Sequence, residues 1–235
     1  MNELLWVSSI PLAYLLYRGT KVTYNDVIAY YRNKELENLS NEKFTEKVKI
    51  IGVGGGGSAI VEYLSNKYPN RYDSIILNSD KKALTSKNVT NKIHLEKSDD
   101  FGCGSNTLCG YNLINDSVIE KLKSFINTDK KVFIFATLGG GCGSGSVRAL
   151  SQYLPMKDLD IQYLLTTPFT WEGLKRTNRA NETIEFLKNN NAKTTVFSND
   201  ELLKFGNMSI KDCFNKQDEE FHKLICTAVW LHKIS

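Results

Sequence analysis

The sequence predicts an α/β fold in which helices flank a parallel sheet. Two observations support this prediction. Short apolar runs alternate with amphipathic segments over most of the chain, and a helix that follows a strand returns the chain for parallel pairing. Two of the apolar runs, residues 47–53 and 131–137, also lead directly into glycine-rich loops. In open α/β sheets, ligands bind at loops that follow the carboxyl ends of the strands.

The first half of this alternation contains three strands and two helices. Lys47–Val53 is expected to be a strand because it is apolar and ends in glycines, and Ser58–Lys67 follows it as a helix. Ser74–Asn78 is expected to be a second strand. Ile114–Phe125 is expected to be helical, because its apolar residues recur at helical spacing on one face. Lys131–Thr137 is so uniformly apolar that it is expected to be a buried strand.

The second half continues the alternation. Gly145–Tyr153 is expected to begin a helix directly after a glycine loop, and Ile161–Thr166 to be a further strand. Gly173–Lys188 is expected to be a helix and Thr194–Ser198 a short strand. Asp212–His232 has the spacing of a long amphipathic helix. Its apolar face is expected to contribute the following side chains to the core: Phe214, Phe221, Leu224, Ile225, Val229 and Leu231.

Composition excludes several classes of protein. The 235 residues are 41% hydrophobic and 24% charged, which suits one domain or slightly more. These values exclude a disulfide mini-protein, a disordered tail and a multi-span membrane protein. The net charge of +4 is too small to predict a nucleic-acid-binding protein. The five cysteines include no CxxC pair and follow no clear secretion signal, so we interpret them as reduced thiols of a cytoplasmic protein.

The N-terminal part is expected to differ from the rest of the chain. A charged, helix-favouring stretch, Asn33–Lys47, precedes the first strong strand, so residues 1–46 are predicted to be an extension and residues 47–235 one domain. The uncharged run Leu4–Tyr17 is shorter than the roughly 20 residues that span a bilayer. Pro11 also interrupts it as a helix. Packing on the core or on a partner is therefore favoured over contact with a membrane surface.

The first glycine loop, Gly52–Gly57, has the pattern G-x-G-x-x-G between a strand and a helix. Asp80 follows Gly57 by 23 residues, near the end of the next expected strand. These facts alone favour a dinucleotide site, in which the glycines let the main chain approach a pyrophosphate. A tight turn without a ligand is the alternative.

The second glycine loop changes the expected ligand. Five of the seven residues in Gly139–Gly145 are glycine, which gives a concave run of backbone N–H groups suited to phosphate oxygens. A dinucleotide enzyme needs one such loop, whereas a mononucleotide with a long phosphate tail can use two. Neither loop is followed by the lysine of a P-loop, so backbone dipoles and a metal ion must balance the phosphate charge.

The order of the motifs resembles one known family. The second loop reads GGGCGSG, which is similar to the GGGTGTG signature of the tubulin/FtsZ family. The resemblance covers nearly all of residues 47–235, through segments that read IGVGGGGSA, ILNSD, FGCGSNTLCGYN, TTPFTWEGLKR and SNDELL. It implies a Rossmann-like parallel sheet flanked by helices that ends at a long central helix. It also implies that the chain binds GTP or GDP, with Mg²⁺ accompanying GTP.

The resemblance assigns phosphate contacts to loop residues. The first and second glycine loops would hold the α- and β-phosphates through backbone N–H groups, with a further hydroxyl from Ser144. Residues 103–106 would face the γ-phosphate. The positions concerned, together with one in the loop after the second strand, are Gly54, Gly55, Gly56, Gly57, Ser58, Asn78, Cys103, Gly104, Ser105, Asn106, Gly140, Gly141, Cys142, Gly143, Ser144 and Gly145.

The resemblance also assigns contacts to the sugar and the base. Glu172 would accept from the ribose hydroxyls, Arg176 would lie beside the ribose and phosphates, and Asn199 would face the sugar and base. Phe214 would stack on guanine, and Asp218 would accept from the guanine N1–H and 2-amino groups. Adenine has no such pair of donors, so Asp218 is the basis for choosing guanine.

Each of these residues also has a purely structural interpretation. Phe214 could be a core residue and Asp218 a solvated one. Glu172 and Arg176 could be a surface pair on a helix, and Asn199 a helix cap. Cys142 is read as a small residue in place of threonine. The histidines do not cluster as metal ligands, so no protein metal site is predicted.

Several positions depart from the pattern of the family. Ala59 stands where FtsZ usually has asparagine, Thr107-Leu108 replaces Pro-Glu, and Tyr111 replaces a common arginine. These changes weaken the expectation of γ-phosphate sensing more than that of guanine binding. The sequence given ends at the long helix, before the acidic loop and second domain of FtsZ. Little hydrolysis by the chain alone is therefore expected, and no catalytic residue is assigned.

Four functions remain open from the sequence. The first is a guanine-nucleotide-binding protein that interacts with a full-length FtsZ or tubulin-like filament or another partner. The second is a GTPase completed by an acidic loop from a partner subunit or a separate C-terminal half. The third is an NAD(P)-dependent oxidoreductase, suggested by G-x-G-x-x-G alone. The fourth is a structural protein without a ligand.

Overall fold

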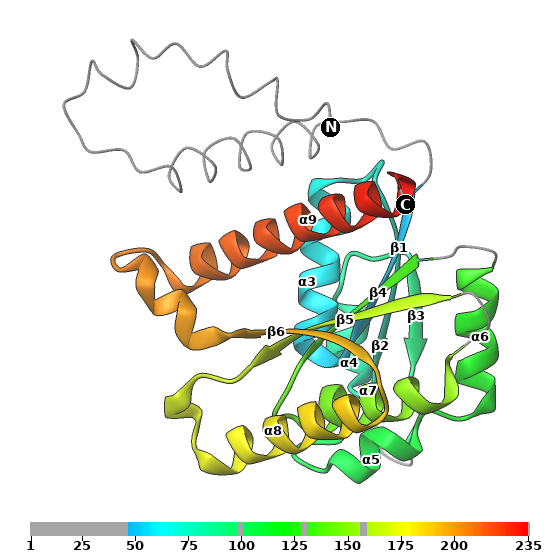
Figure 1. Ribbon diagram of the computed structural model, residues 1–235. Coiled ribbons are helices and arrows are strands. Elements are labelled where there is room, and N and C mark those ends of the chain that lie inside the picture. Colours follow the sequence, from blue (N-terminus) through cyan, green and yellow to red (C-terminus); the bar gives the residue numbers. More distant parts are fainter. Residues whose placement is uncertain (1–46, 98–100, 128–130, 156–158, 235) are drawn as a thin grey trace. The chain divides into compact units, whose positions relative to one another are not determined.

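The computed structural model describes residues 47–97, 101–127, 131–155 and 159–234 (Figure 1). The predictions for the extension, including the Leu4–Tyr17 run, lie outside the described residues. Within them, no helix is long and apolar enough to cross a membrane.

A six-stranded sheet forms the centre of the described domain, and all its strands are parallel. The strand order is β3-β2-β1-β4-β5-β6. Val53 pairs with Leu77 on one side and with Ala136 on the other, so β1, β2 and β4 end at the same edge. This confirms the predicted parallel α/β fold. The strands are β1 (Val48–Val53), β2 (Tyr72–Asn78), β3 (Asn91–His94), β4 (Lys131–Thr137), β5 (Asp160–Thr167) and β6 (Lys193–Ser198).

Helices cover both faces of the sheet (Figure 1). Apolar residues of α6, α7 and α8 pack against one face, and those of α3, α4 and α9 pack against the other. Two 3₁₀ helices, η2 and η3, precede α8 and α9 respectively. The helices are α3 (Gly54–Lys67), α4 (Lys81–Thr85), α5 (Thr107–Asn112), α6 (Asp116–Ile126), α7 (Gly141–Tyr153), η2 (Thr170–Glu172), α8 (Leu174–Asn189), η3 (Asn199–Phe205) and α9 (Ile210–Ile234).

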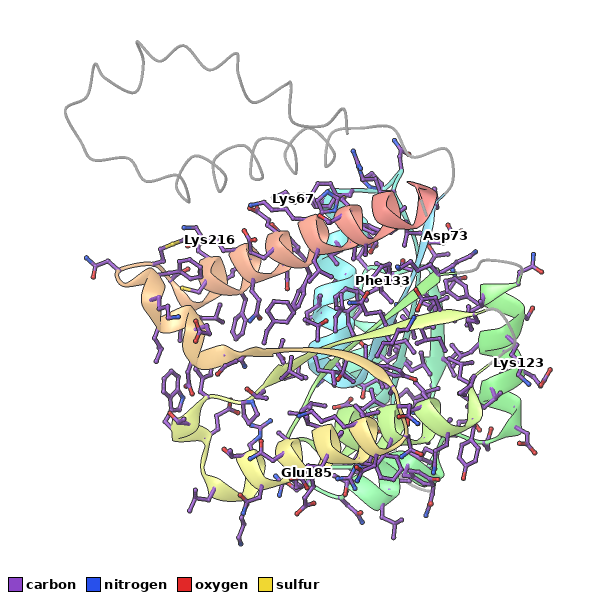
Figure 2. The ribbon with its side chains drawn as sticks, in the orientation of Figure 1. Lys67, Asp73, Lys123, Phe133, Glu185 and Lys216 are labelled. Atoms are coloured by element: carbon purple, nitrogen blue, oxygen red, sulfur yellow. A yellow bond between two sulfur atoms is a disulfide. The ribbon has the colours of Figure 1, made fainter. Side chains whose placement is uncertain are left out.

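Strand β4 shows how its sequence produces a buried central strand. Successive side chains point to opposite faces, so Phe133 and Phe135 pack toward α9 and Ile134 packs toward α6 and α7. All three side chains are fully buried. The Phe135 ring meets Phe221 of α9 edge to face, with centroids 5.4 Å apart. Figure 2 shows Phe133 between the sheet and α9, while Lys216 extends outward.

The amphipathic face predicted for α9 packs as expected over most of its length. Phe221 and Ile225 are fully buried, and Leu224 and Val229 pack against the same cluster. Phe214 differs, because it packs on a separate small cluster next to the cavity described below. The side chain of the sixth expected core residue, Leu231, lies outside the described set.

Three helices begin earlier than the sequence predicts, and two of them begin in glycine. Helix α9 begins at Ile210 instead of Asp212. Helix α3 begins at Gly54 instead of Ser58, and α7 begins at Gly141 instead of Gly145. Glycine has a low intrinsic preference for helix, so propensity alone places both starts too late. Ile114–Phe125 corresponds to α6, which begins at Asp116 because the Asn115 side chain accepts from Val118 N. The short elements α4, β3 and α5 were not predicted.

The interpretation of all five cysteines as reduced thiols is wrong for two of them. Cys103 and Cys109 form a disulfide, with their Cα atoms 5.7 Å apart. A turn at Gly104 and the start of α5 bring them together, and neither CxxC spacing nor a secretion signal detects a pair of this kind. The free cysteines among the described residues are Cys142, Cys213 and Cys226.

Candidate functional site

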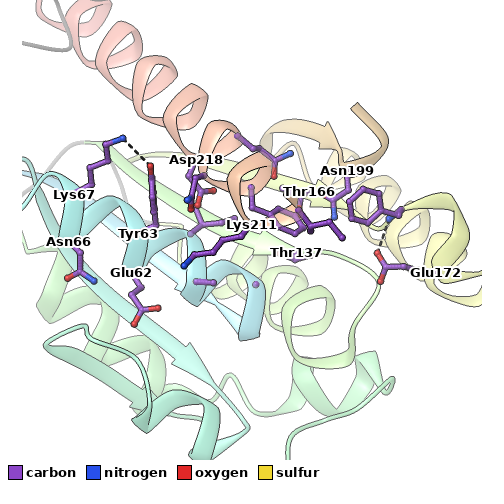
Figure 3. Close-up of a pocket in the computed structure, with 18 of the residues that line it drawn as sticks. Glu62, Tyr63, Asn66, Lys67, Thr137, Thr166, Glu172, Asn199, Lys211 and Asp218 are labelled. Carbon is purple, nitrogen blue, oxygen red and sulfur yellow. Dashed lines mark hydrogen bonds between the residues drawn. The ribbon is translucent and has the colours of Figure 1, made fainter. Parts of the chain in front are cut away.

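A large cavity of about 1360 Å³ lies between α3, α9 and the loops that follow β4, β5 and β6 (Figure 3). Its walls combine apolar rings with a small number of polar side chains, as expected for a small-molecule site. The lining residues are Gly56, Ala59, Ile60, Glu62, Tyr63, Asn66, Lys67, Thr137, Thr166, Phe169, Trp171, Glu172, Asn199, Ile210, Lys211, Phe214, Asn215, Gln217 and Asp218.

The cavity brings together five of the residues assigned from the sequence, namely Gly56, Glu172, Asn199, Phe214 and Asp218. The other assigned residues do not line it. They lie at the end of β2, in the loop after β3, in the starts of α3 and α7, which follow β1 and β4, and, for Arg176, in α8. These residues are Gly54, Gly55, Gly57, Ser58, Asn78, Cys103, Gly104, Ser105, Asn106, Gly140, Gly141, Cys142, Gly143, Ser144, Gly145 and Arg176.

Asp218 is a buried carboxyl in the wall of this cavity. It is 6% exposed and has no hydrogen bond or salt bridge to the residues that the structure describes. Burial, and next the nearby Glu219, raise the pKa of Asp218 to about 7. The interpretation of Asp218 as a merely solvated residue is therefore wrong.

Phe214 lies one helical turn before Asp218 and lines the same cavity. Its ring meets Phe169 edge to face at 6.2 Å, and Phe169 in turn stacks on Trp171. Phe214 is only partly buried, so one side of the ring can receive a planar ligand.

Asn199 is almost fully buried, at 4% exposure, and its Oδ1 has no hydrogen-bond partner in the described structure. The interpretation of Asn199 as a helix cap is wrong. Ser198 caps η3 instead, because its Oγ accepts from Asp200 N at 3.2 Å. A buried acceptor without a partner is unusual in a folded protein and indicates a group that a ligand completes.

Glu172 and Arg176 do form the ion pair that the sequence allowed. A Glu172 carboxylate oxygen lies 2.5 Å from Arg176 Nη1. Glu172 also accepts from Phe169 N at 2.8 Å, which fixes the short turn that holds the Phe169 ring. Arg176 does not line the cavity, so the structure places only the carboxylate of this pair at the site.

The starts of α3 and α7 present two sets of backbone donors. Neither helix has a side-chain cap at its N-terminus, and neither has an acidic residue in its first turn. Gly141 N of α7 donates to the Gly104 carbonyl. The other N–H groups of the two first turns have no partner within their own helix and lie at the positive end of the helix dipole, which favours an anion. Ser144 Oγ accepts from Gly139 N at 2.9 Å, so this hydroxyl holds the loop together from within.

The glycines of these loops divide into two groups. A Cβ at Gly56 would lie 1.9 Å from Thr137 Oγ1, and one at Gly145 would lie 2.0 Å from Thr107 O, so close packing requires glycine there. A Cβ at Gly55 or at Gly140 would meet nothing within 4 Å. These open glycines are the ones at which the main chain can approach a ligand.

The loop of residues 103–106 is joined to both neighbouring loops. Cys103 N donates to Ser79 Oγ at 3.0 Å, and the Gly104 carbonyl accepts from Gly141 N at 2.7 Å. Cys103 is 7% exposed and its sulfur is in the disulfide, so any ligand contact from it must come from the main chain.

Two basic residues at the site were missed by the sequence reasoning. Arg179 Nε donates to Gly139 O at 2.9 Å and its Nη2 donates to Ser105 Oγ at 3.3 Å, so it joins the second and third loops. Lys211 lines the cavity, and Figure 3 shows it extending from α9 toward α3. The sequence held one signal for Lys211, because it precedes Phe214 at helical spacing and is therefore expected on the same face of the helix.

No protein metal site is assigned. Within the described ranges, no group of three or more histidine, cysteine, aspartate or glutamate side chains could hold a metal ion.

Comparison with known proteins identifies the domain. The family model described as "Tubulin/FtsZ family, GTPase domain" matches residues 47–207. The chain belongs to the tubulin/FtsZ family. Among curated relatives, the cell division protein FtsZ of Mycoplasmopsis pulmonis is 31% identical over 181 residues, which is 76% of this chain and 46% of that protein. FtsZ of Aquifex aeolicus is 30% identical over 183 residues, covering 76% of this chain and 50% of that protein.

A solved FtsZ structure shows the same architecture. The empty FtsZ dimer from M. jannaschii is 26% identical and has a TM-score of 0.67. The match covers 87% of this chain and 58% of that chain. The chain thus spans about half the length of the curated FtsZ relatives that it matches. Membership of a GTPase family confirms the resemblance and leaves the G-x-G-x-x-G pattern as the only support for an NAD(P) enzyme.

Proposed function

We propose that this chain binds GTP or GDP at the carboxyl edge of its sheet. The base would occupy the cavity between Phe214 and Asp218, with Asn199 and Glu172 toward the sugar. The phosphates would lie at the starts of α3 and α7. The two helix starts have no side-chain cap and no acidic residue in the first turn, which supports this arrangement, because a phosphate tail needs donors that are not already taken by a carboxylate.

The observation that carries the proposal is the burial of Asp218. A carboxyl that is 6% exposed and has no partner among the described residues destabilises the empty protein when it ionises. Guanine offers the missing partners, since its N1–H and 2-amino groups donate side by side to one carboxylate. Adenine has an acceptor at N1, and NAD presents adenine, so neither fits this wall.

Hydrolysis by the chain alone is proposed to be slow. The carboxylates near the loops already have partners that orient them. Glu62 accepts from Lys87 and from Asn88 N, and Glu172 accepts from Phe169 N and Arg176. None of them is available to orient an attacking water, which is a requirement for phosphoryl transfer to water.

We therefore propose that the residue that activates water comes from a partner subunit. The curated relatives are cell division proteins of the FtsZ type, so the partner is expected to be an FtsZ-like filament or a separate C-terminal half. In this arrangement the chain acts as a nucleotide-binding interaction protein, and it becomes a GTPase when completed in trans. Mg²⁺ bound with GTP and a cytoplasmic location stay predictions.

Calorimetric titration of the purified chain with GTP, GDP, ATP and NAD tests the proposal. The guanine nucleotides are expected to bind at least about tenfold more tightly than ATP or NAD, which corresponds to about 1.4 kcal/mol. Equal or tighter binding of NAD would refute the guanine site. Phosphate release is expected to rise only when a full-length FtsZ is added, and rapid release by the chain alone would refute the need for a partner.

A further inference from the structure

We propose that Cys103 and Cys109 are a reversible redox pair, and that their disulfide closes the second glycine loop against nucleotide phosphate. The proposal rests on the proposed function, because it concerns access to the same site. Cys103 lies in the loop after β3, and Cys109 lies in α5. Through hydrogen bonds, this loop links Ser79, directly after β2, to the start of α7.

The disulfide holds a short ring that blocks one phosphate donor. Residues 104–108 lie between the two cysteines, so the bond limits how far the ring can open. Within this ring, the Gly104 carbonyl accepts from Gly141 N at 2.7 Å. Gly141 is the first residue of α7, so its N–H group belongs to the set that would otherwise face a phosphate.

Asn106 and Thr107 of the ring pack closely on α7, because a Cβ at Gly141 would lie 2.6 Å from Asn106 O and one at Gly145 would lie 2.0 Å from Thr107 O. The turn at Gly104 has fewer contacts. Gly104 is exposed, has a φ of 56°, and a Cβ there would meet nothing within 4 Å, so no packed side chain fixes it. Beyond the ring, Ser105 is held by the 3.3 Å hydrogen bond from Arg179. When the disulfide is broken, the Gly104 carbonyl can move away and release the Gly141 N–H group.

Thiol–disulfide exchange interconverts the two states. In oxidation, the Cys109 thiolate attacks a small-molecule disulfide such as glutathione disulfide and expels one thiolate. The Cys103 thiolate then attacks the Cys109 sulfur of the mixed disulfide, which forms the ring bond and releases the second thiol. The protein loses two electrons and two protons, and the small disulfide becomes two thiols. Cys109 is the entry point because it is partly exposed, whereas Cys103 is 7% exposed.

The core does not depend on this bond. The main apolar clusters run through both faces of the sheet and include neither cysteine. A disulfide that lies in a ligand-facing loop and outside the core is more typical of a redox-regulated site than of a bond that stabilises the fold.

The test compares the full chain after treatment with glutathione disulfide and after reduction with dithiothreitol. Titration with GTP is expected to show at least about tenfold tighter binding in the reduced state. Thiol counting in denaturant is expected to show two more free thiols after reduction. Cys109→Ser is expected to bind GTP equally in both conditions, while the control Cys213→Ala keeps the difference.

Hydrogen exchange separates failure of this proposal from failure of the nucleotide site. The Gly141 amide is expected to exchange faster after reduction, whether or not nucleotide binds. If the Gly141 amide exchanges faster after reduction but GTP binds in neither state, the guanine site is refuted. The proposal that the disulfide controls access of nucleotide to that site is then refuted as well, whereas the reversible disulfide itself is supported. Unchanged exchange, equal thiol counts, or a redox effect that persists in Cys109→Ser would overturn the redox proposal itself.

Discussion

Asp218→Asn separates the function of this carboxyl from its effect on stability. The substitution keeps the shape of the side chain but removes the negative charge. It also replaces one acceptor oxygen by an amide donor, which faces the donors of guanine. If Asp218 accepts hydrogen bonds from the guanine base, the variant should bind GTP more weakly. If burial of its charge destabilises the empty site, the same variant should become more stable.

Both magnitudes follow from the burial of the carboxyl. Two hydrogen bonds to a charged group at roughly 1.5–3 kcal/mol each predict a loss of about 3–6 kcal/mol, or roughly 10²- to 10⁴-fold in GTP affinity. Burial raises the pKa of Asp218 from 3.8 to about 7. Between these values the folded protein binds more protons than the unfolded chain, so stability falls as pH rises. At about 1.36 kcal/mol per pH unit, ionisation of Asp218 lowers the free energy of unfolding by at most roughly 4 kcal/mol.

Melting experiments and titrations check the two effects. Without nucleotide, the variant should be more stable than the wild type at pH 8, and this advantage should disappear near pH 4. XTP should bind the variant better than GTP, because the carbonyl of xanthine at C2 accepts from the new amide. Glu220→Gln, an exposed neighbour that pairs with Lys223, is the matched control and should change neither property. Unchanged GTP affinity in Asp218→Asn would mean that the base is read elsewhere.

Three further predictions follow from the same geometry. GTP affinity should fall about tenfold per pH unit below about 7, because Asp218 must lose its proton to accept from guanine, and a flat profile between pH 5.5 and 8 would contradict this. Gly140→Ala should weaken GTP binding without lowering the melting temperature, since its Cβ meets nothing within 4 Å. Gly145→Ala should instead cost about 1–3 kcal/mol of stability by overpacking, and equal melting curves for the two variants would refute the distinction. Lys211→Ala should weaken GTP binding several-fold and reduce its salt dependence, because the ammonium extends into the cavity. Lys216→Ala is its control, since that side chain lies over Phe205, and an equal loss in both would indicate only a general charge effect.

The central strands were the most predictable part of the fold. The bounds of β4, Lys131–Thr137, agree with the expectation, because an apolar run buried on both faces has few alternatives. The edge strand β3, Asn91–His94, was missed. It has only Ile93 buried, and a four-residue strand with one core side chain leaves no periodic signal.

The helices that begin in glycine show where local propensity fails. The first turns of α3 and α7 contain glycine despite its low preference for helix, because several positions have no room for a side chain: a Cβ at Gly57 would lie 2.2 Å from Phe135 O, and one at Gly141 would lie 2.6 Å from Asn106 O. Such contacts involve residues distant in sequence and leave no mark on local composition.

The site was predictable where a motif covered it. Asn199 and Glu172 were assigned from family motifs, Phe214 and Asp218 were assigned from their positions in the family, and all four line the cavity. Lys211 was missed because its only signal, helical spacing before Phe214, does not by itself indicate a ligand contact. Whether the four residues contact a nucleotide stays a prediction that the titrations above address.

The distinction between closely packed glycines and open glycines affects how a glycine-rich loop is interpreted in relatives of this domain. A descendant that had lost its nucleotide would still need glycine at the positions of Gly56 and Gly145, because neighbouring protein atoms leave no room for a side chain. A glycine-rich loop in such a protein would therefore indicate that the packing of sheet and helices is retained, and it would not indicate that nucleotide still binds. Substitution of glycine by larger residues should appear first at Gly55 and Gly140, where only a bound phosphate would exclude a side chain. These two positions can therefore distinguish relatives that still bind nucleotide from those that only keep the fold.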